Sequence, residues 1–99
     1  MQTYAIMRRR GWSTRDELDD AGDRSNTVRE GEMAGQMHWI RSYFFEEEDG
    51  TLGTICIYEA QSADAIREHA GRALLPADEV LPVKETVVAR PDPEPVTAG

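Results

Sequence analysis

Two neighbouring segments, His38–Glu46 (HWIRSYFFE) and Thr51–Ala60 (TLGTICIYEA), decide the fold of this chain. Both are rich in β-branched and aromatic residues, and Asp49-Gly50 between them is a signal for a tight hairpin turn. The sequence therefore predicts two adjacent antiparallel strands. Both segments carry large apolar side chains on their two alternating faces, so we expect neither face of the hairpin to be fully exposed to water.

The segments on either side of this hairpin each add a strand and a helix. Before it, the sequence predicts a strand over Gln2–Arg8 and, after a capping-box pattern, a helix from Thr14 to about Arg29. After it, the sequence predicts a helix from Ser62 to about residue 74 and a last strand over Val80–Ala89. A further short helical turn is expected at 76–79, and the proline-rich tail, residues 90–99, is expected to be disordered or loosely extended.

The predicted order β-α-β-β-α-β is that of the ferredoxin-like split βαβ arrangement. This α+β fold has a four-stranded antiparallel sheet with both helices on one face, and we expect it to form one domain over residues 1–89. The other face of the sheet would be left bare. Because the strands are apolar on both sides, we expect a second copy of the chain to cover that face and to form a dimeric α+β barrel.

Composition excludes several classes of protein. No apolar run among the 99 residues approaches the roughly 20 that a membrane helix needs. The N-terminal segment has its charges after its short apolar stretch, which is the reverse of a secretory signal. The single cysteine, Cys56, excludes an internal disulfide, so we expect a cytoplasmic protein. The net charge of −8 arises entirely from residues 31–99, and such an acidic surface disfavours nucleic acids as partners. With no long apolar run, no membrane partner is expected either.

His69 is the first candidate for chemistry. It lies on the apolar stripe of the second predicted helix and is therefore expected to face the sheet, near Tyr58 or Cys56. An imidazole there is either a general base, with Tyr58 as a second catalytic residue, or a ligand for a divalent transition metal such as nickel. The structural alternative is a buried histidine that is hydrogen-bonded to a backbone carbonyl or a tyrosine. His38 and Glu68 complete the candidate metal ligands.

Several large side chains are candidates for a ligand pocket between the sheet and the helices. An apolar wall with a few polar groups is typical of small-molecule sites. The structural alternative is that these side chains belong to the core or to a dimer interface, and Cys56 is expected to pack as a small hydrophobe. The candidate pocket residues are Trp39, Tyr43, Cys56, Tyr58 and Glu59.

From Trp39 onward, the chain resembles a family of small bacterial proteins of largely unknown function that includes nickel-binding members. The segments that carry the resemblance are 39–43 (WIRSY), 56–60 (CIYEA), 67–70 (REHA) and 75–80 (LPADEV). The resemblance implies a ferredoxin-like fold, a dimer formed through the sheets, and a metal site. The chain has only two histidines, His38 and His69, and is poorer in histidine than the nickel-binding members.

Three functions are compatible with these patterns, and the sequence leaves open whether the chain is an enzyme. The first is a cytoplasmic dimer that binds a nickel-like metal ion or a small organic ligand without turnover. The second is a small barrel enzyme, such as a cofactor-free monooxygenase, a haem-degrading enzyme, an isomerase or a cyclase, with His69 as base or ligand. The third is a non-catalytic interaction module whose acidic half docks on a basic partner.

Overall fold

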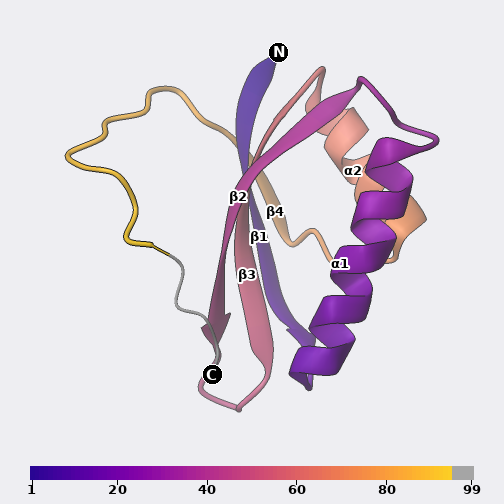
Figure 1. Ribbon diagram of the computed structural model, residues 1–99, viewed down its shortest axis with the longest axis vertical. Coiled ribbons are helices and arrows are strands. Elements are labelled where there is room, and N and C mark those ends of the chain that lie inside the picture. Colours follow the sequence, from indigo (N-terminus) through magenta and orange to yellow (C-terminus); the bar gives the residue numbers. More distant parts are fainter. Residues whose placement is uncertain (95–99) are drawn as a thin grey trace.

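Four antiparallel strands and two helices make up the computed structural model of this chain, which describes residues 1–94 (Figure 1). The elements are β1 (Gln2–Trp12), α1 (Arg15–Glu30), β2 (Met37–Glu46), β3 (Leu52–Ala60), α2 (Ala63–Ala73) and β4 (Glu79–Pro82). The strands lie side by side in the order β2-β3-β1-β4. The predicted α+β fold with a ferredoxin-like order of elements is therefore confirmed.

Side-chain caps determine where both helices begin. The Thr14 hydroxyl oxygen accepts a hydrogen bond of 3.2 Å from the backbone N–H of Glu17, and the Ser62 hydroxyl oxygen accepts one of 3.1 Å from Ala65. Each cap satisfies a backbone donor that the first helical turn leaves without a partner. Both starts agree with the sequence prediction. Neither helix has the length and apolarity that crossing a bilayer requires.

The chain between α2 and β4 has no helical turn, although one was expected at residues 76–79. Helix α2 ends at Ala73, and its C-terminal cap, Leu74, adopts a left-handed backbone conformation with φ 57° and ψ 47°. The backbone N–H of Asp78 then donates to the carbonyl oxygen of Met7 in β1 at 2.9 Å. This N–H bonds to the sheet and not to a carbonyl oxygen of its own turn, so residues 75–78 form no helical turn.

The last strand is also shorter than predicted. The sequence indicated a strand over Val80–Ala89, whereas β4 ends at Pro82. Proline has no N–H to donate, and the last backbone bond to β1 runs from Val83 to Thr3 at 2.8 Å. Residues 84–94 form neither helix nor strand, and the rest of the tail, residues 95–99, lies outside the described residues.

Both helices pack on one face of the sheet, and the core lies between these two layers (Figure 1). The most deeply buried apolar residues of this core include Ile6, Met33, Met37, Ala60 and Ile66. Residues 83–94, which follow β4, pass on the opposite side of the sheet (Figure 1). There the Tyr43 hydroxyl donates to the Asp92 carboxylate at 2.9 Å.

An extra residue in β2 changes which of its side chains face the helices. Trp39 and Arg41 pair with consecutive residues of β3, so Ile40 has no cross-strand partner of its own. Such a bulge shifts the alternation of side chains by one residue. The sequence analysis listed Trp39 and Tyr43 together as residues of one pocket on the helix side of the sheet, and for Tyr43 this is wrong. Trp39 faces the helices, whereas Tyr43 lies on the opposite face.

Candidate functional site

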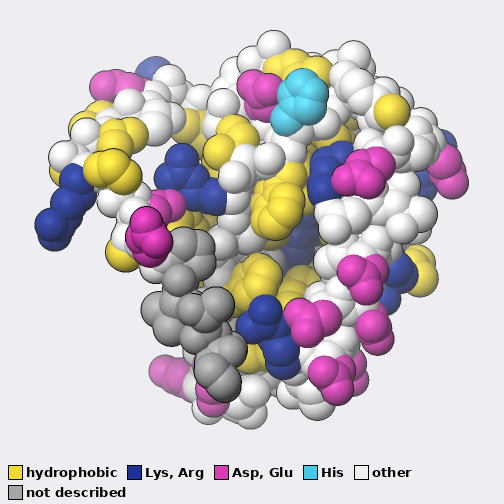
Figure 2. Space-filling model, viewed as in Figure 1, with side chains coloured by type: hydrophobic (Ala, Val, Ile, Leu, Met, Phe, Trp, Pro, Cys, Tyr) yellow, Lys and Arg dark blue, Asp and Glu magenta, His cyan; other side chains and the backbone are white. Residues whose placement is uncertain are grey.

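A cavity of about 110 Å³ lies between α1 and the sheet. It exists because α1 presents the small residues Ala21, Gly22 and Ser25 to the sheet, where larger side chains would fill the space. Figure 2 shows hydrophobic side chains, with basic ones among them, in a hollow beside α1. The residues that line it are Arg8, Trp12, Leu18, Ala21, Gly22, Ser25, Asn26, Arg29, Trp39, Ser42, Phe44, Thr54, Cys56, Tyr58 and Leu75.

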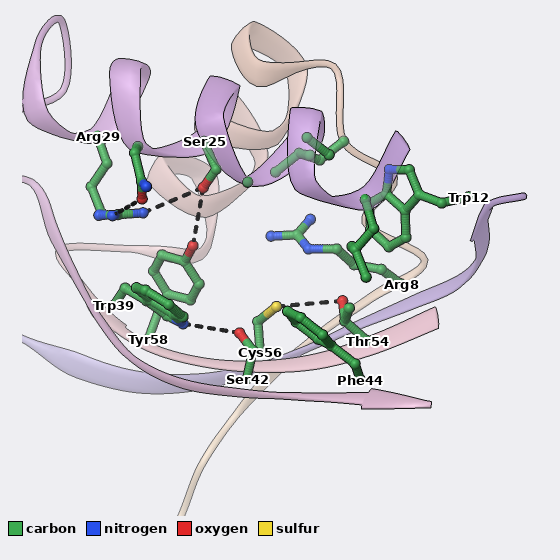
Figure 3. Close-up of a pocket in the computed structure, with 15 residues that line it drawn as sticks. Arg8, Trp12, Ser25, Arg29, Trp39, Ser42, Phe44, Thr54, Cys56 and Tyr58 are labelled. Carbon is green, nitrogen blue, oxygen red and sulfur yellow. Dashed lines mark hydrogen bonds between the residues drawn. The ribbon is translucent and has the colours of Figure 1, made fainter. Parts of the chain in front are cut away.

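Four aromatic side chains line the cavity (Figure 3). Trp12 and Tyr58 are buried and form its inner part, whereas Trp39 and Phe44 are 49% and 50% exposed and border its opening. The Trp39 indole N–H donates to the Ser42 hydroxyl at 2.9 Å, which fixes the orientation of this ring. The wall therefore offers flat apolar surfaces, as small-molecule sites usually do.

Two guanidinium groups supply positive charge to the cavity. Arg8 reaches it from β1 and is only 2% exposed, and its guanidinium points into the space between α1 and the sheet (Figure 3). Arg29 reaches it from α1, with its guanidinium carbon 5.5 Å from the centroid of the Trp39 ring. This distance is within the range of a cation–π interaction. Arg29 therefore connects α1 to β2 across the cavity.

Ser25 links the cavity to the buried histidine of α2. Its hydroxyl lies 3.3 Å from the Tyr58 hydroxyl and 3.3 Å from Nε2 of His69. The same Nε2 lies 3.1 Å from the Ser25 carbonyl oxygen, which can only accept a hydrogen bond, so Nε2 carries the proton. His69 is 1% exposed, and its other ring nitrogen, Nδ1, has no hydrogen-bond partner among residues 1–94.

The pKa of His69 is lowered from its ordinary value of 6.5. Burial is the main cause, since it disfavours the charged imidazolium. The hydrogen bond to Ser25 opposes this shift, whereas the positive charges of Arg8 and Arg29 add to it. His69 is therefore a neutral imidazole near pH 7, and it matches the structural alternative of a buried, carbonyl-bonded histidine.

The structure brings some of the predicted pocket residues together and separates others. Trp39, Cys56 and Tyr58 line the cavity. Tyr43 and Glu59 do not, because they lie on the sheet face away from the helices. For Tyr43, the cause is the bulge in β2. For Glu59, it is ordinary strand alternation, which turns consecutive residues of β3 to opposite faces.

Comparison with known proteins identifies the family. The family model described as "Nickel responsive protein SCO4226-like" matches residues 4–83. The chain belongs to this family. The crystal structure of SCO4226 from Streptomyces coelicolor A3(2) is similar to this chain, with a TM-score of 0.66 and 22% sequence identity over 86% of this chain and 99% of that one. At this identity, the likeness supports the ferredoxin-like fold alone. Among curated proteins, none matches the chain.

The family description raises the question of whether this member's own residues can hold nickel. Among residues 1–94, no three His, Cys, Asp or Glu side chains are grouped closely enough to hold a metal ion. The three predicted ligands lie apart: His69 is in the core, His38 is on the opposite face of the sheet, and Glu68 is exposed on α2. Glu68 pairs instead with Arg72 at 3.0 Å. A single chain of this family member therefore does not assemble the predicted site.

Sequence reasoning missed the most unusual cavity residue in this family member, Arg8. The sequence analysis did not name Arg8 as a cavity residue, yet Arg8 alternates with Tyr4 and Ile6 on the buried face of β1. That period-two pattern was a readable signal, because a strand turns every second side chain to the same face. Phe44 and Trp12 were also missed as cavity residues, since their positions depend on two strand irregularities.

Proposed function

We propose that this chain is a small binding protein that holds an organic molecule in the cavity between α1 and the sheet, without chemical turnover. The observation that carries this proposal is the cavity wall, which combines four aromatic rings with polar and charged side chains. We further propose that it acts in the cytoplasm, since its one cysteine, Cys56, is free and buried.

Binding without turnover is favoured because the best candidate for proton transfer lies outside the cavity wall. His69 is not among the residues that line the cavity, and its Nε2 is engaged by Ser25. A general base must come within hydrogen-bond reach of the proton that it removes. Tyr58 lines the cavity, but its hydroxyl lies beside that of Ser25 rather than beside a base. These contacts support a ligand-binding role over an enzymatic one.

Blocking the cavity from α1 tests this proposal. A Cβ built on Gly22 meets no atom within 4 Å, so a large side chain there would enter free space. We expect Gly22→Phe to weaken the binding of single-ring aromatic compounds roughly 10-fold or more, which corresponds to about 1.4 kcal/mol of lost contact. Trp12 and Trp39 are the only tryptophans and both line the cavity, so their fluorescence during a ligand titration measures this affinity.

The matched control for this experiment is Gly22→Ala. This variant adds one methyl group at the same position and replaces a helical glycine, which should stabilise the fold by up to about 1 kcal/mol. The affinity of Gly22→Ala for single-ring aromatic compounds should equal that of the natural chain. Equal affinities of the Phe and Ala variants would contradict the proposed cavity function.

We also propose that two copies pair through the sheet face opposite the helices. In support, Tyr43 and Leu81 on this face are 44% and 49% exposed, and Met7, Ile55 and Ile57 beside them are only half-buried. Exposed apolar patches of this kind mark interaction surfaces. Asp92 holds part of the C-terminal segment against this face, so pairing would displace that segment or include it in the interface.

A nickel-responsive role of such a dimer is a second candidate, suggested by the family description. Nδ1 of His38 lies 2.7 Å from a carboxylate oxygen of Glu59 on the face where two copies would meet. A dimer therefore offers two imidazoles and two carboxylates, which are suitable nickel ligands if the interface brings them together.

Elemental analysis after nickel loading, with the dimer mass measured by light scattering, tests this candidate. We expect one nickel ion per dimer, lost in His38→Asn and retained in His69→Gln. Nickel that remains bound in His38→Asn, or that is lost only in His69→Gln, would rule out the His38–Glu59 site.

A further inference from the structure

Arg8 is a buried cation without an acidic partner among residues 1–94. It is 2% exposed, and its guanidinium donates one hydrogen bond, from Nη1 to the carbonyl oxygen of Pro76. Among the described residues 1–94, it takes part in none of the ion pairs. A guanidinium has five N–H donors, and a charge that is removed from water without a partner is costly. The remaining donors of Arg8 face the cavity (Figure 3).

The lack of a counter-ion is specific to this position. The protein has 19 acidic residues, and several of its exposed arginines pair with them, including Arg9 with Glu47 at 2.9 Å and Arg15 with Asp19 at 2.8 Å. Yet, within the part of the chain that the structure describes, the cavity lining contains no Asp or Glu. The second cavity arginine, Arg29, bonds to the neutral oxygens of Ser25 and Asn26. The cavity is therefore a positively charged site in an acidic protein.

A further hydrogen-bond donor lies next to Arg8. Thr54 of β3 is its direct cross-strand partner, so both side chains lie on the helix side of the sheet. The Thr54 hydroxyl oxygen already accepts a hydrogen bond from Sγ of Cys56 at 3.4 Å, which leaves the Thr54 hydroxyl proton free to be donated. Arg8 and Thr54 together offer several donors to one anion.

From this geometry, we propose that the cavity binds a small aromatic monocarboxylate, with its carboxylate on Arg8 and its ring among Trp12, Trp39 and Phe44. This inference rests on the proposed cavity function and adds the chemical class of the ligand. One planar guanidinium matches one carboxylate through two parallel hydrogen bonds. The flat walls suit ring stacking, and a volume of about 110 Å³ suits a single ring rather than a nucleotide.

Fluorescence titrations with benzoate and with benzamide, its neutral isostere, test the inference. We expect the natural chain to bind benzoate at least 10-fold more tightly than benzamide, since hydrogen bonds to a charged group add about 10- to 100-fold. Arg8→Met should remove this preference, because it weakens the binding of benzoate far more than the binding of benzamide. Arg67→Met, which removes an exposed arginine of α2 and changes the net charge equally, should preserve it.

The outcomes separate this inference from the function on which it rests. Equal binding of benzoate and benzamide by the natural chain would overturn the carboxylate assignment while keeping the cavity function. The absence of binding by both compounds would contradict both proposals. Inorganic phosphate that displaces benzoate at equal concentration would show a general anion site and would also overturn the assignment. If Arg8→Met does not fold, a benzoate-dependent shift of the Arg8 side-chain N–H resonance in the natural chain decides the question, and no shift overturns the inference.

Discussion

Replacing Gly53 with alanine will lower the free energy of unfolding by about 2 kcal/mol, within the range of overpacked interiors. Gly53 lies in β3 opposite Phe45 of β2. A Cβ at this position would stand 2.8 Å from the carbonyl oxygen of Arg8 and 2.8 Å from a ring carbon of Phe45. The phenyl ring can rotate away, but the carbonyl oxygen belongs to the backbone of β1. The sheet must therefore shift to accommodate the methyl group.

Thermal unfolding measures this effect. For a chain of this length, a loss of about 2 kcal/mol corresponds to a fall in Tm of about 8–16 °C. Gly71→Ala is the matched control, because a Cβ on this helical glycine of α2 meets no atom within 4 Å and should stabilise the fold by up to about 1 kcal/mol. If Gly53→Ala has the same Tm as the natural chain, then β1 and β3 are not packed so closely at Gly53.

The stability of the protein will fall as the pH is lowered from 7.5 to 5.5, because of His69. In the unfolded chain this side chain takes up a proton near its ordinary pKa of 6.5, whereas in the folded chain its pKa is lowered. At a pH between the pKa of His69 in the folded chain and its pKa in the unfolded chain, the unfolded chain binds more protons than the folded chain. The free energy of unfolding therefore decreases with falling pH, by at most about 1.4 kcal/mol per pH unit. Above about pH 6.5 this contribution is fully present.

Urea unfolding at several pH values tests this dependence. The variant His69→Gln has no titrating group at this position, and its amide can still donate to the Ser25 carbonyl. Its free energy of unfolding should vary less with pH between 5.5 and 7.5 than that of the natural chain. His38→Gln, which replaces the exposed histidine in the same way, is the matched control. Equal slopes for the natural chain and His69→Gln would mean that His69 does not cause the pH dependence.

The fold could be predicted from the sequence because its local signals agree with one another. The caps at Thr14 and Ser62 and the turn at Asp49-Gly50 each define one boundary, and together they limit the order of elements to a single arrangement. The short β4 is the clearest difference. Val87 and Val88 favour a strand by composition, but they are exposed and bond to no strand in the structure. Strand propensity alone does not supply a partner.

The cavity was harder to predict than the fold. Its presence follows from small residues on α1, and the sequence analysis did locate Trp39, Cys56 and Tyr58 between the sheet and the helices. Its chemistry depends on Arg8, and a charged residue is rarely expected in a core position. The assignment of Tyr43 depended on strict alternation along β2. The alternation of side chains cannot reveal a bulge in a strand that is apolar on both faces. Whichever set of alternate residues faces the helices, similar apolar side chains are buried.

The bulge at Ile40 has a consequence for how the protein behaves at high concentration. In the described part of the chain, β2 is an outer strand, and its outer edge presents backbone donors and acceptors without a strand partner. A straight aromatic edge of this length is a template on which further chains add and aggregate. The extra residue bends that edge, and Arg41 beside it brings a charge. The residue that turns Trp39 toward the cavity therefore also hinders the growth of fibres from this edge.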